Sequence, residues 1–337
     1  MEQIRAISSA PGWRLEESFV DWLHVRQPNL GRYPVVNDGR VIRLDRDGQV
    51  LSETAMTMAV EGSFDTSIRL RITDEFLEIS GNPARFDRAH NLFGFTFEKS
   101  LDIFDQVLHR VGASALDRSS AVKGETSDGN LVRDGFRVLR IDLTFNVMFG
   151  SPGRLQSFLR AMRRHGISRY KTERFQTTVS FASKSHVLKI YDKGRQFLDL
   201  GVAPEAVGRW CFDNGIARFE TTLKRDKLRR SGLRYGRAHS EFLPVIREEV
   251  MSIPERVDEV DVSGLTDREL GTFCMWQLGH RVRELLPIAT FYRRRKAILK
   301  ATGFDVGTEP PLQFKQKFEP IVGVQITEED LPEHLRA

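Results

Sequence analysis

Apolar and polar residues alternate at every second position in several stretches of the chain, and this period predicts β-strands. The clearest stretch is Phe136–Met148, which places on one face Leu139, Ile141, Leu143, Phe145 and Val147. Its other face is polar and contains Arg140, Asp142, Thr144 and Asn146. Further strands are predicted at Phe19–Val25, Arg40–Leu44, Thr66–Ile72, Phe76–Ile79, Gln176–Phe181, His186–Asp192 and Ile216–Lys224.

Segments in which apolar residues recur at helical spacing lie between some of these strands. It predicts a helix from Glu98 to Val111, ended by Gly112, and a second helix with Ser151 as N-cap and Pro152 as first residue, ended by Gly166. Arg195–Leu200, Asp267–Arg281 and a basic helix from Thr290 to Gly303 are predicted in the same way. Arg118–Asn130 is polar and is expected to form an exposed loop.

The resulting fold class is α+β, an antiparallel β-sheet with helices packed on one face, plus a C-terminal helical region. Two parts are expected. Residues 1–240 would form the α+β domain with its core at 64–224. Residues 241–337 would be mainly helical, with a basic helix at 290–302 and a loose acidic tail from Glu328.

Composition agrees with a soluble globular protein, because the 337 residues are 40% hydrophobic and 29% charged. The net charge of +5 and the pI near 9.3 favour an anionic partner without demanding one. Cys211 and Cys274 lack metal-type spacing, and no apolar run reaches transmembrane length. We therefore expect a cytoplasmic protein with no role at a membrane.

Common catalytic signatures are missing from the sequence. It has no phosphate-binding Gly-Lys-Ser/Thr loop, no Gly-x-Gly-x-x-Gly after a strand, no His-Glu-x-x-His, no nucleophile elbow and no cysteine zinc cluster. Nucleoside-triphosphate hydrolysis, dinucleotide redox chemistry and zinc chemistry are therefore not expected.

The polar faces of three predicted strands do carry a set of reactive side chains: Asp142, Glu220, and Tyr191 with Lys193. Two carboxylates on rigid strands suit a hard cation such as Mg²⁺ or Mn²⁺. A tyrosine hydroxyl is a nucleophile when a neighbouring base or cation helps it ionise, and Lys189 or Lys193 could also stabilise charge on a phosphate. These are the components of a transesterification at a DNA phosphodiester.

Simpler interpretations apply to each residue taken singly. Asp142 beside Arg140, and Glu220 beside Arg218, are typical of cross-strand ion pairs. Tyr191 fits a half-buried strand tyrosine, and His90 fits a hydrogen-bonded structural histidine. Two basic segments, at 224–230 and 293–295, can each be interpreted as a solvated surface or as a set of DNA-phosphate contacts. Their basic residues are Lys224, Arg225, Lys227, Arg229, Arg230, Arg293, Arg294 and Arg295.

The order of these motifs resembles the filamentous-phage replication initiator family, the gene II/gene X type of rolling-circle initiators. The matching pieces, spread over about residues 80 to 305, are His90–Gly94, Arg140–Phe145, Leu188–Lys193, Arg218–Lys224 and Phe291–Arg294. Plasmid initiators that combine an Arg-x-Asp strand, a Tyr-x-Lys element and an Arg-x-Glu strand are similar at a greater distance. The chain departs from the widespread rolling-circle endonucleases, because it has no His-hydrophobe-His pair and His90 and His186 stand apart.

The resemblance implies a site-specific nicking and rejoining enzyme that acts on phage or plasmid origin DNA, either single-stranded or supercoiled. Tyr191 would keep the 5′ end as a phosphotyrosine and free a 3′-OH, Asp142 and Glu220 would hold Mg²⁺ or Mn²⁺, and Lys193 would steady the phosphate. His90, Asn91, Lys189, Arg140 and Arg218 would be further site or DNA contacts. Host helicase and polymerase are possible partners.

Two other functions remain open from the residues alone. The first is an origin-binding or regulatory DNA-binding protein that keeps the scaffold and does not cleave. It would show steep salt dependence and no covalent adduct. The second, an RNA-binding or processing protein, is less favoured because no interleaved aromatic stacking motif is found. If a second tyrosine acts, Tyr170, Tyr235 and Tyr292 are the candidates.

Overall fold

The computed structural model describes residues 14–35, 39–119, 122–125, 131–133, 135–165, 171–174, 177–250, 256–257, 264–277, 280–308 and 321–336. Its strands are β1 (Phe19–Pro28), β2 (Arg40–Leu44), β3 (Val50–Ala55), β4 (Met58–Gly62), β5 (Thr66–Ile72), β6 (Phe76–Gly81), β7 (Val122–Glu125), β8 (Leu131–Arg133), β9 (Arg137–Met148), β10 (Lys171–Arg174), β11 (Thr178–Ala182), β12 (His186–Asp192), β13 (Ile216–Lys224), β14 (Arg256–Val257), β15 (Ile321–Val322) and β16 (Val324–Ile326). Its helices are α1 (Phe97–Arg110), α2 (Pro152–His165), α3 (Lys193–Leu200), α4 (Glu205–Asp213), α5 (Arg225–Arg230), α6 (His239–Val250), α7 (Asp267–Gln277), α8 (Val282–Leu285) and α9 (Ile288–Thr302).

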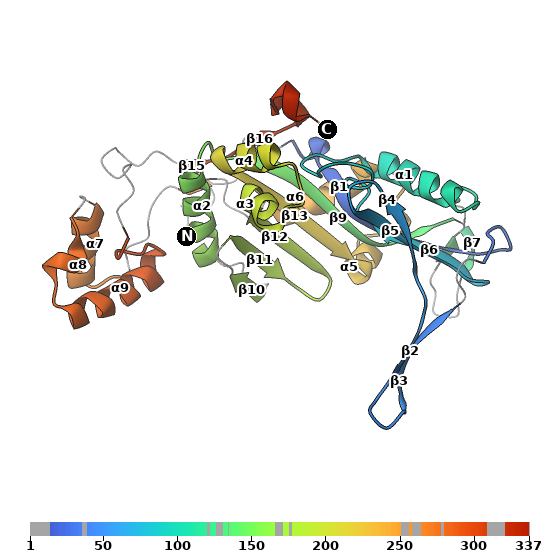
Figure 1. Ribbon diagram of the computed structural model, residues 1–337, viewed down its shortest axis with the longest axis horizontal. Helices are drawn as coiled ribbons and strands as arrows, with labels where there is room; N and C mark the ends of the chain where they lie inside the picture. The colour runs from blue at the N-terminus through green and yellow to red at the C-terminus, as the bar shows by residue number, and fades with distance from the viewer. Residues whose placement is uncertain are drawn as a thin grey trace.

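A ten-stranded antiparallel sheet forms the centre of the molecule (Figure 1). Its order is β10-β11-β12-β13-β9-β1-β6-β5-β4, and the short C-terminal strand β16 pairs with β9. The longest strand, β9, lies in the middle, and it is the strand whose alternation in the sequence is clearest. The predicted α+β fold with an antiparallel sheet and a helical C-terminal region is confirmed.

One face of the sheet is apolar and packs against α1, α2 and α6 in a large hydrophobic core. Phe158 of α2 illustrates this packing, because its ring centroid lies 6.1 Å from that of Phe219 on β13. Burial of such side chains stabilises the fold by about 1.5–3 kcal/mol each. The core therefore fixes which face of β9, β12 and β13 remains for polar side chains.

The opposite face is polar over most of its area but is covered at one end. There α3, α4 and the loop 82–96 pack over the sheet around a second apolar cluster that includes Phe197, Cys211 and Ile216. The C-terminal segment contributes Ile326 and the buried Leu331 to the same cluster. The tail from Glu328 was expected to be loose, and this is wrong, because Leu331 is only 1% exposed.

Two irregularities shift side chains relative to the simple alternation. β1 changes register against β9 between Val20 and Trp22, so that Asp21 is an extra residue at this point. A second shift between His24 and Val25 leaves Leu139 outside the regular pairing, and Val138 is the buried residue instead. The expected inward position of Leu139 is therefore wrong.

The elements that were not expected from the sequence include β4, β10, β14, β15, β16 and α4. The segment 118–130, expected to be a loop, contains part of the β7–β8 hairpin. The predicted end of α2 at Gly166 lies outside the described residues. The basic helix begins at Ile288, two residues before Thr290, and ends at the predicted Gly303 with φ of 73°.

Helices α7, α8 and α9 form a group with its own apolar cluster, which includes Phe273, Trp276 and Phe291. Figure 1 shows this group beyond α2, and it shows the β2–β3 hairpin projecting away from the sheet. The sheet extends over the expected domain boundary, because β16 pairs with β9 and α6 packs in the main core. The division at residue 240 stays a prediction. No helix in the described part of the chain has the length and apolar character needed to cross a membrane.

Candidate active site

Antiparallel pairing arranges the polar side chains of the sheet in rows that run across the strands. In one row Glu220 of β13 lies between Thr144 of β9 and Lys189 of β12. The adjacent row contains Arg218 between Asn146 and Tyr191. Because same-face residues along a strand repeat every two positions, about 6.6 Å apart, these rows form one compact polar surface.

Tyr191 and Glu220 are direct partners on this surface. The Tyr191 hydroxyl lies 3.4 Å from Oε2 of Glu220, to which it donates, while Lys189 donates to Oε1 at 2.9 Å. Tyr191 is 8% exposed, and burial is the main reason why its pKa is raised. At neutral pH the group is therefore a neutral hydroxyl held by a carboxylate.

Asp142 lies in the next row, opposite Thr222 of β13. Arg140 binds it through two hydrogen bonds, from Nε to Oδ1 at 2.9 Å and from Nη2 to Oδ2. The pKa of Asp142 is raised to about 6, mainly by burial and in part by the charge of Glu220, while Arg140 opposes the shift. The sequence-predicted pair Asp142 and Glu220 is thus close enough to interact electrostatically, and each carboxylate also has a cationic neighbour.

Lys193 belongs to a helix and not to the strand on which it was expected. It is the first residue of α3, and Asp192 is the N-cap whose side chain accepts from Arg195 N–H. Lys193 is 2% exposed and donates from Nζ to Asn91 Oδ1 at 3.0 Å and to Gln196 Oε1 at 2.8 Å. Burial lowers its pKa well below the usual value, with Arg218 adding to the effect.

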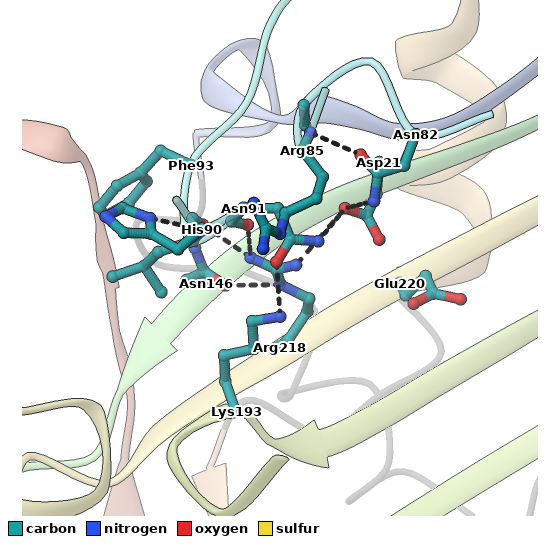
Figure 2. A network of polar contacts seen from close by, with 12 residues as sticks. Asp21, Asn82, Arg85, His90, Asn91, Phe93, Asn146, Lys193, Arg218 and Glu220 are labelled. Atoms are coloured by element: carbon teal, nitrogen blue, oxygen red, sulfur yellow. Dashed lines mark hydrogen bonds and ion pairs between the residues drawn. The ribbon is translucent and has the colours of Figure 1, made fainter. Parts of the chain in front are cut away.

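A buried arginine ties the loop 82–96 to the sheet (Figure 2). Arg218 is fully buried and donates to Asn146 Oδ1 at 3.1 Å and to the carbonyl oxygens of Asn91 and Leu92. Its Nη1 lies 3.6 Å from Oδ1 of Asp21. Its position inside this network explains how the loop keeps Asn91 beside Lys193.

Asp21 is a site residue that the sequence pattern did not reveal. Its Oδ1 accepts from Asn91 Nδ2 at 2.7 Å and from Asn82 Nδ2 at 3.1 Å (Figure 2). The irregularity in β1 turns it toward the polar face, and alternation alone cannot show an extra residue of this kind. An aspartate in a strand otherwise rich in aromatic and β-branched residues was the available signal.

Part of this polar surface lines a cleft of about 610 Å³, and Asp142, which is 3% exposed, is not among its walls. Tyr191, Glu220, Lys193, Asn91 and Asp21 are all among its walls. The cleft is polar and accessible, whereas His90 lies behind it with 2% exposure, and burial lowers the pKa of this imidazole to about 4. His90 Nδ1 lies 3.3 Å from Leu92 N, from which it accepts, so the imidazole is placed as a structural group.

Residues 19–241, well over half of the chain, match the family model for the N-terminal part of the phage replication-associated protein of the gene II type. The chain belongs to this phage replication initiator family. The match contains the candidate residues of β9, β12 and β13, and it does not reach α9.

Individual members agree with this assignment over most of their length. The replication-associated protein of this type from Enterobacteria phage I2-2 is 24% identical over 313 residues, which are 85% of this chain and 87% of that protein. The protein of the same name from Escherichia phage If1 is 22% identical over 313 residues, covering 77% and 93% respectively. A solved rolling-circle replication initiator protein from Geobacillus stearothermophilus covers 69% of this chain and 80% of its own at 11% identity, and its TM-score of 0.26 does not establish a shared fold.

A divalent cation was expected between Asp142 and Glu220, and the oxygen donors present are of the right kind. The hydroxyl Oγ1 of Thr144, opposite Glu220 and two residues from Asp142, is buried with no hydrogen-bond partner in the described part of the chain. No group of three His, Cys, Asp or Glu side chains suited to a metal occurs among the described residues. Since Mg²⁺ commonly uses one or two carboxylates together with water and substrate phosphates, the pair fits. Metal dependence itself stays a prediction.

The basic candidates fall into two groups in the structure. Lys224, Arg225 and Arg229 are exposed and have no ion-pair partner within the described ranges, so their cationic groups are accessible to phosphate. Other members have partners within the chain: Arg230 donates to Ser185, Lys227 faces Glu248, Arg294 donates to Thr272 and Arg295 binds Asp305. Arg293 of α9 is exposed.

Proposed function

We propose that the protein initiates rolling-circle replication by nicking origin DNA with Tyr191 as the nucleophile, and later rejoins the strand. Membership in the phage replication initiator family supports the process. The observation that supports the chemistry is the hydrogen bond from the Tyr191 hydroxyl to Glu220 inside a cleft that also contains Lys193. The substrate would be phage or plasmid origin DNA, and host helicase and polymerase would act on the product.

In the nicking step, Tyr191 Oη forms a bond to the scissile phosphorus and the bond from phosphorus to the 3′ oxygen breaks. The protein then holds the 5′ end as a phosphotyrosine. The tyrosine proton leaves toward Glu220, which is its acceptor in the structure, and the departing 3′ oxygen takes up a proton from solvent water and ends as a hydroxyl. Rejoining is the reverse attack by a 3′-OH on the phosphotyrosine.

The cations of the cleft suit the charge that develops on the phosphate. Lys193 is buried, so a phosphate oxygen beside it would favour its charged form and would itself be stabilised in a site of low dielectric constant. Lys189 holds Oε1 of Glu220 and thereby leaves Oε2 directed at the tyrosine. Asn91 positions Lys193, and Arg218 fixes the backbone of Asn91.

Asp142 and Glu220 would hold a Mg²⁺ or Mn²⁺ ion, which would neutralise phosphate charge and polarise the phosphoryl oxygen when bound. Thr144 lies beside both carboxylates and could contribute its free hydroxyl. Arg140 and Lys189 balance the two negative charges while no cation is present.

The test uses supercoiled DNA that contains the cognate origin, with Mg²⁺ or Mn²⁺. Wild-type protein should produce nicked circles with protein on the 5′ end, and EDTA should abolish nicking. Tyr191→Phe should reduce nicking by at least about a thousand-fold, as expected when a nucleophile is removed. Tyr235→Phe is the matched control and should nick like wild type.

Nicking by Tyr191→Phe at the wild-type rate would refute the assignment of the nucleophile. Nicking in EDTA at the rate seen with Mg²⁺ would refute the metal assignment. Tight, salt-sensitive origin binding by the wild type with no nick and no adduct in either metal would instead indicate a DNA-binding protein that does not cleave.

A further inference from the structure

A second polar cleft of about 300 Å³ lies on the same face of the sheet, outside the cleft that contains Tyr191. Its walls come from β1, β5, β6 and β9 and from Thr57, which precedes β4. They include Trp22, His24, Arg69, Arg71 and Arg140. Its position is defined by the pairing of these strands, which places it toward the β4 edge of the sheet.

The cleft lies at one end of a row of basic side chains that crosses five strands. Arg69 pairs with Ser80, Ser80 with His24, His24 with Arg140, and Arg140 with Lys224. With strands about 4.8 Å apart, the row extends over roughly 20 Å. Along β9, Arg140 precedes Asp142 by two residues on the same face, so the row runs beside Asp142, and the row that contains Tyr191 lies three rows further along the strands.

The charges of this row are not all balanced by carboxylates. Glu78 is bound by His24 and Arg71 as well as by Arg26, and Asp142 is bound by Arg140. Arg69 is exposed and makes no ion pair with any described residue. The Nε of Arg71 is buried and has no hydrogen-bond partner within the same ranges. The guanidinium group of Arg69 is therefore available for an anion, whereas Arg71 donates to Glu78, a carboxylate that also lines the cleft.

An aromatic wall accompanies these donors. Trp22 lies on the cleft and has Arg140 on its ring, with the guanidinium carbon 5.5 Å from the ring centroid. A cleft that combines an aromatic side chain with a free guanidinium group suits a nucleotide, whose base stacks and whose phosphate accepts hydrogen bonds. In a duplex the base is stacked between its neighbours, so an unpaired base fits this wall and a paired base does not.

We infer that this cleft binds one nucleotide of single-stranded DNA that leads to the scissile phosphate, with the base against Trp22 and the phosphate against Arg69. The strand then follows the basic row past Arg140 toward Lys224. The inference rests on the proposed function for the identity of the strand. It adds a binding subsite that makes the enzyme select melted over paired origin DNA.

The test measures binding in the full-length Tyr191→Phe protein, so that no covalent product forms. The probe is a fluorescein-labelled oligothymidylate of about 16 nucleotides, a length in the range of single-strand binding sites, followed by anisotropy at several salt concentrations. Arg69→Gln should weaken binding about five-fold or more, and it should reduce the salt slope by about 0.7, the value for one lost phosphate contact on a single strand.

Arg43→Gln on the exposed strand β2 is the matched control, because it removes the same charge outside the cleft and should bind like the parent. Trp22→Leu should weaken binding without changing the salt slope, since a stacking contact releases no counterions. Equal affinities of the Arg69→Gln and Arg43→Gln proteins would overturn the inference. So would an equal effect of Arg69→Gln on a blunt duplex of the same length.

The binding test of the subsite and the nicking test of Tyr191 can succeed or fail separately. Loss of single-strand affinity in Arg69→Gln, together with nicking by Tyr191→Phe, would support the subsite and refute the nucleophile. An unchanged affinity in Arg69→Gln, together with a phosphotyrosine at Tyr191, would refute the subsite and support Tyr191 as the nucleophile. A melting temperature of Arg69→Gln equal to that of the parent shows that the exposed substitution leaves the fold intact.

Discussion

At the scale of single residues, the site depends on buried charge that is satisfied by neighbours. Arg218 has no exposed surface, yet Asn146 and two carbonyl oxygens of the loop 82–96 accept its hydrogen bonds. The sequence predicted Arg218 on the polar face, and the alternating pattern was sufficient for that. It could not predict the burial, because the covering loop is distant in sequence and α4 has no clear signal of its own.

His90 gives a pH dependence of stability that can be measured. Burial lowers its pKa from the usual 6.5 to about 4, so the unfolded chain binds a proton at a higher pH than the folded one. The contribution is fully present above pH 6.5 and is lost as the pH falls toward 4. Urea unfolding at pH 7.5 and pH 5 should show a larger loss for wild type than for His90→Gln.

The exposed His334 is the control for that experiment, and His334→Gln should lose stability between the two pH values to the same extent as wild type. A His90→Gln protein with the wild-type pH dependence would contradict the buried, neutral state of this imidazole.

At the scale of elements, sequence patterns located the strands that hold the site and missed those that complete it. β9, β12 and β13 have regular alternation or β-branched content, and each was predicted within a few residues. β16 has three residues and β10 has four, which is too short for a period to be recognised. Asp21 was missed for another reason, because an irregularity in β1 reverses the side on which it lies.

Two arginines of the basic helix α9 are expected to have different roles, one as a phosphate contact and the other as a structural residue. Arg295 binds Asp305 through two hydrogen bonds, whereas Arg293 is exposed. We expect Arg293→Ala to reduce the salt slope of duplex-origin binding by about 0.9, as for one lost phosphate contact. Arg295→Ala should leave that slope nearly unchanged. Its effect should be on stability, by up to about 1 kcal/mol. Equal salt slopes for Arg293→Ala and wild type would exclude a phosphate contact at this position.

At the scale of the whole molecule, the ends of the described chain meet at the central strand. β1 and β16 both pair with β9, and Gln325 Nε2 donates to the carbonyl oxygen of Arg14 at 2.9 Å. Ile326 and Leu331 then close the apolar cluster behind α3, where Lys193 begins. The C-terminal segment therefore supports the site even though it provides none of the reactive groups.

This support predicts different effects for two neighbouring residues of β16. Ile326 is 4% exposed and Val324 is 60% exposed. Ile326→Ala should reduce the free energy of unfolding by about 2–4 kcal/mol, because it leaves a cavity in the cluster. Val324→Ala should change it by less than about 0.5 kcal/mol. Urea denaturation of both variants measures the difference, and equal values would show that β16 is not packed as described.

The proposed function requires that one tyrosine in this sheet forms a covalent bond to DNA. The direct measurement is mass spectrometry of the protein after reaction with supercoiled origin DNA, complete nuclease digestion and proteolysis. The predicted result is a nucleotide phosphate on the peptide that contains Tyr191, absent when Tyr191 is replaced by Phe. A modified peptide containing Tyr170, Tyr235 or Tyr292 instead, or nicked DNA with no modified peptide, would contradict it.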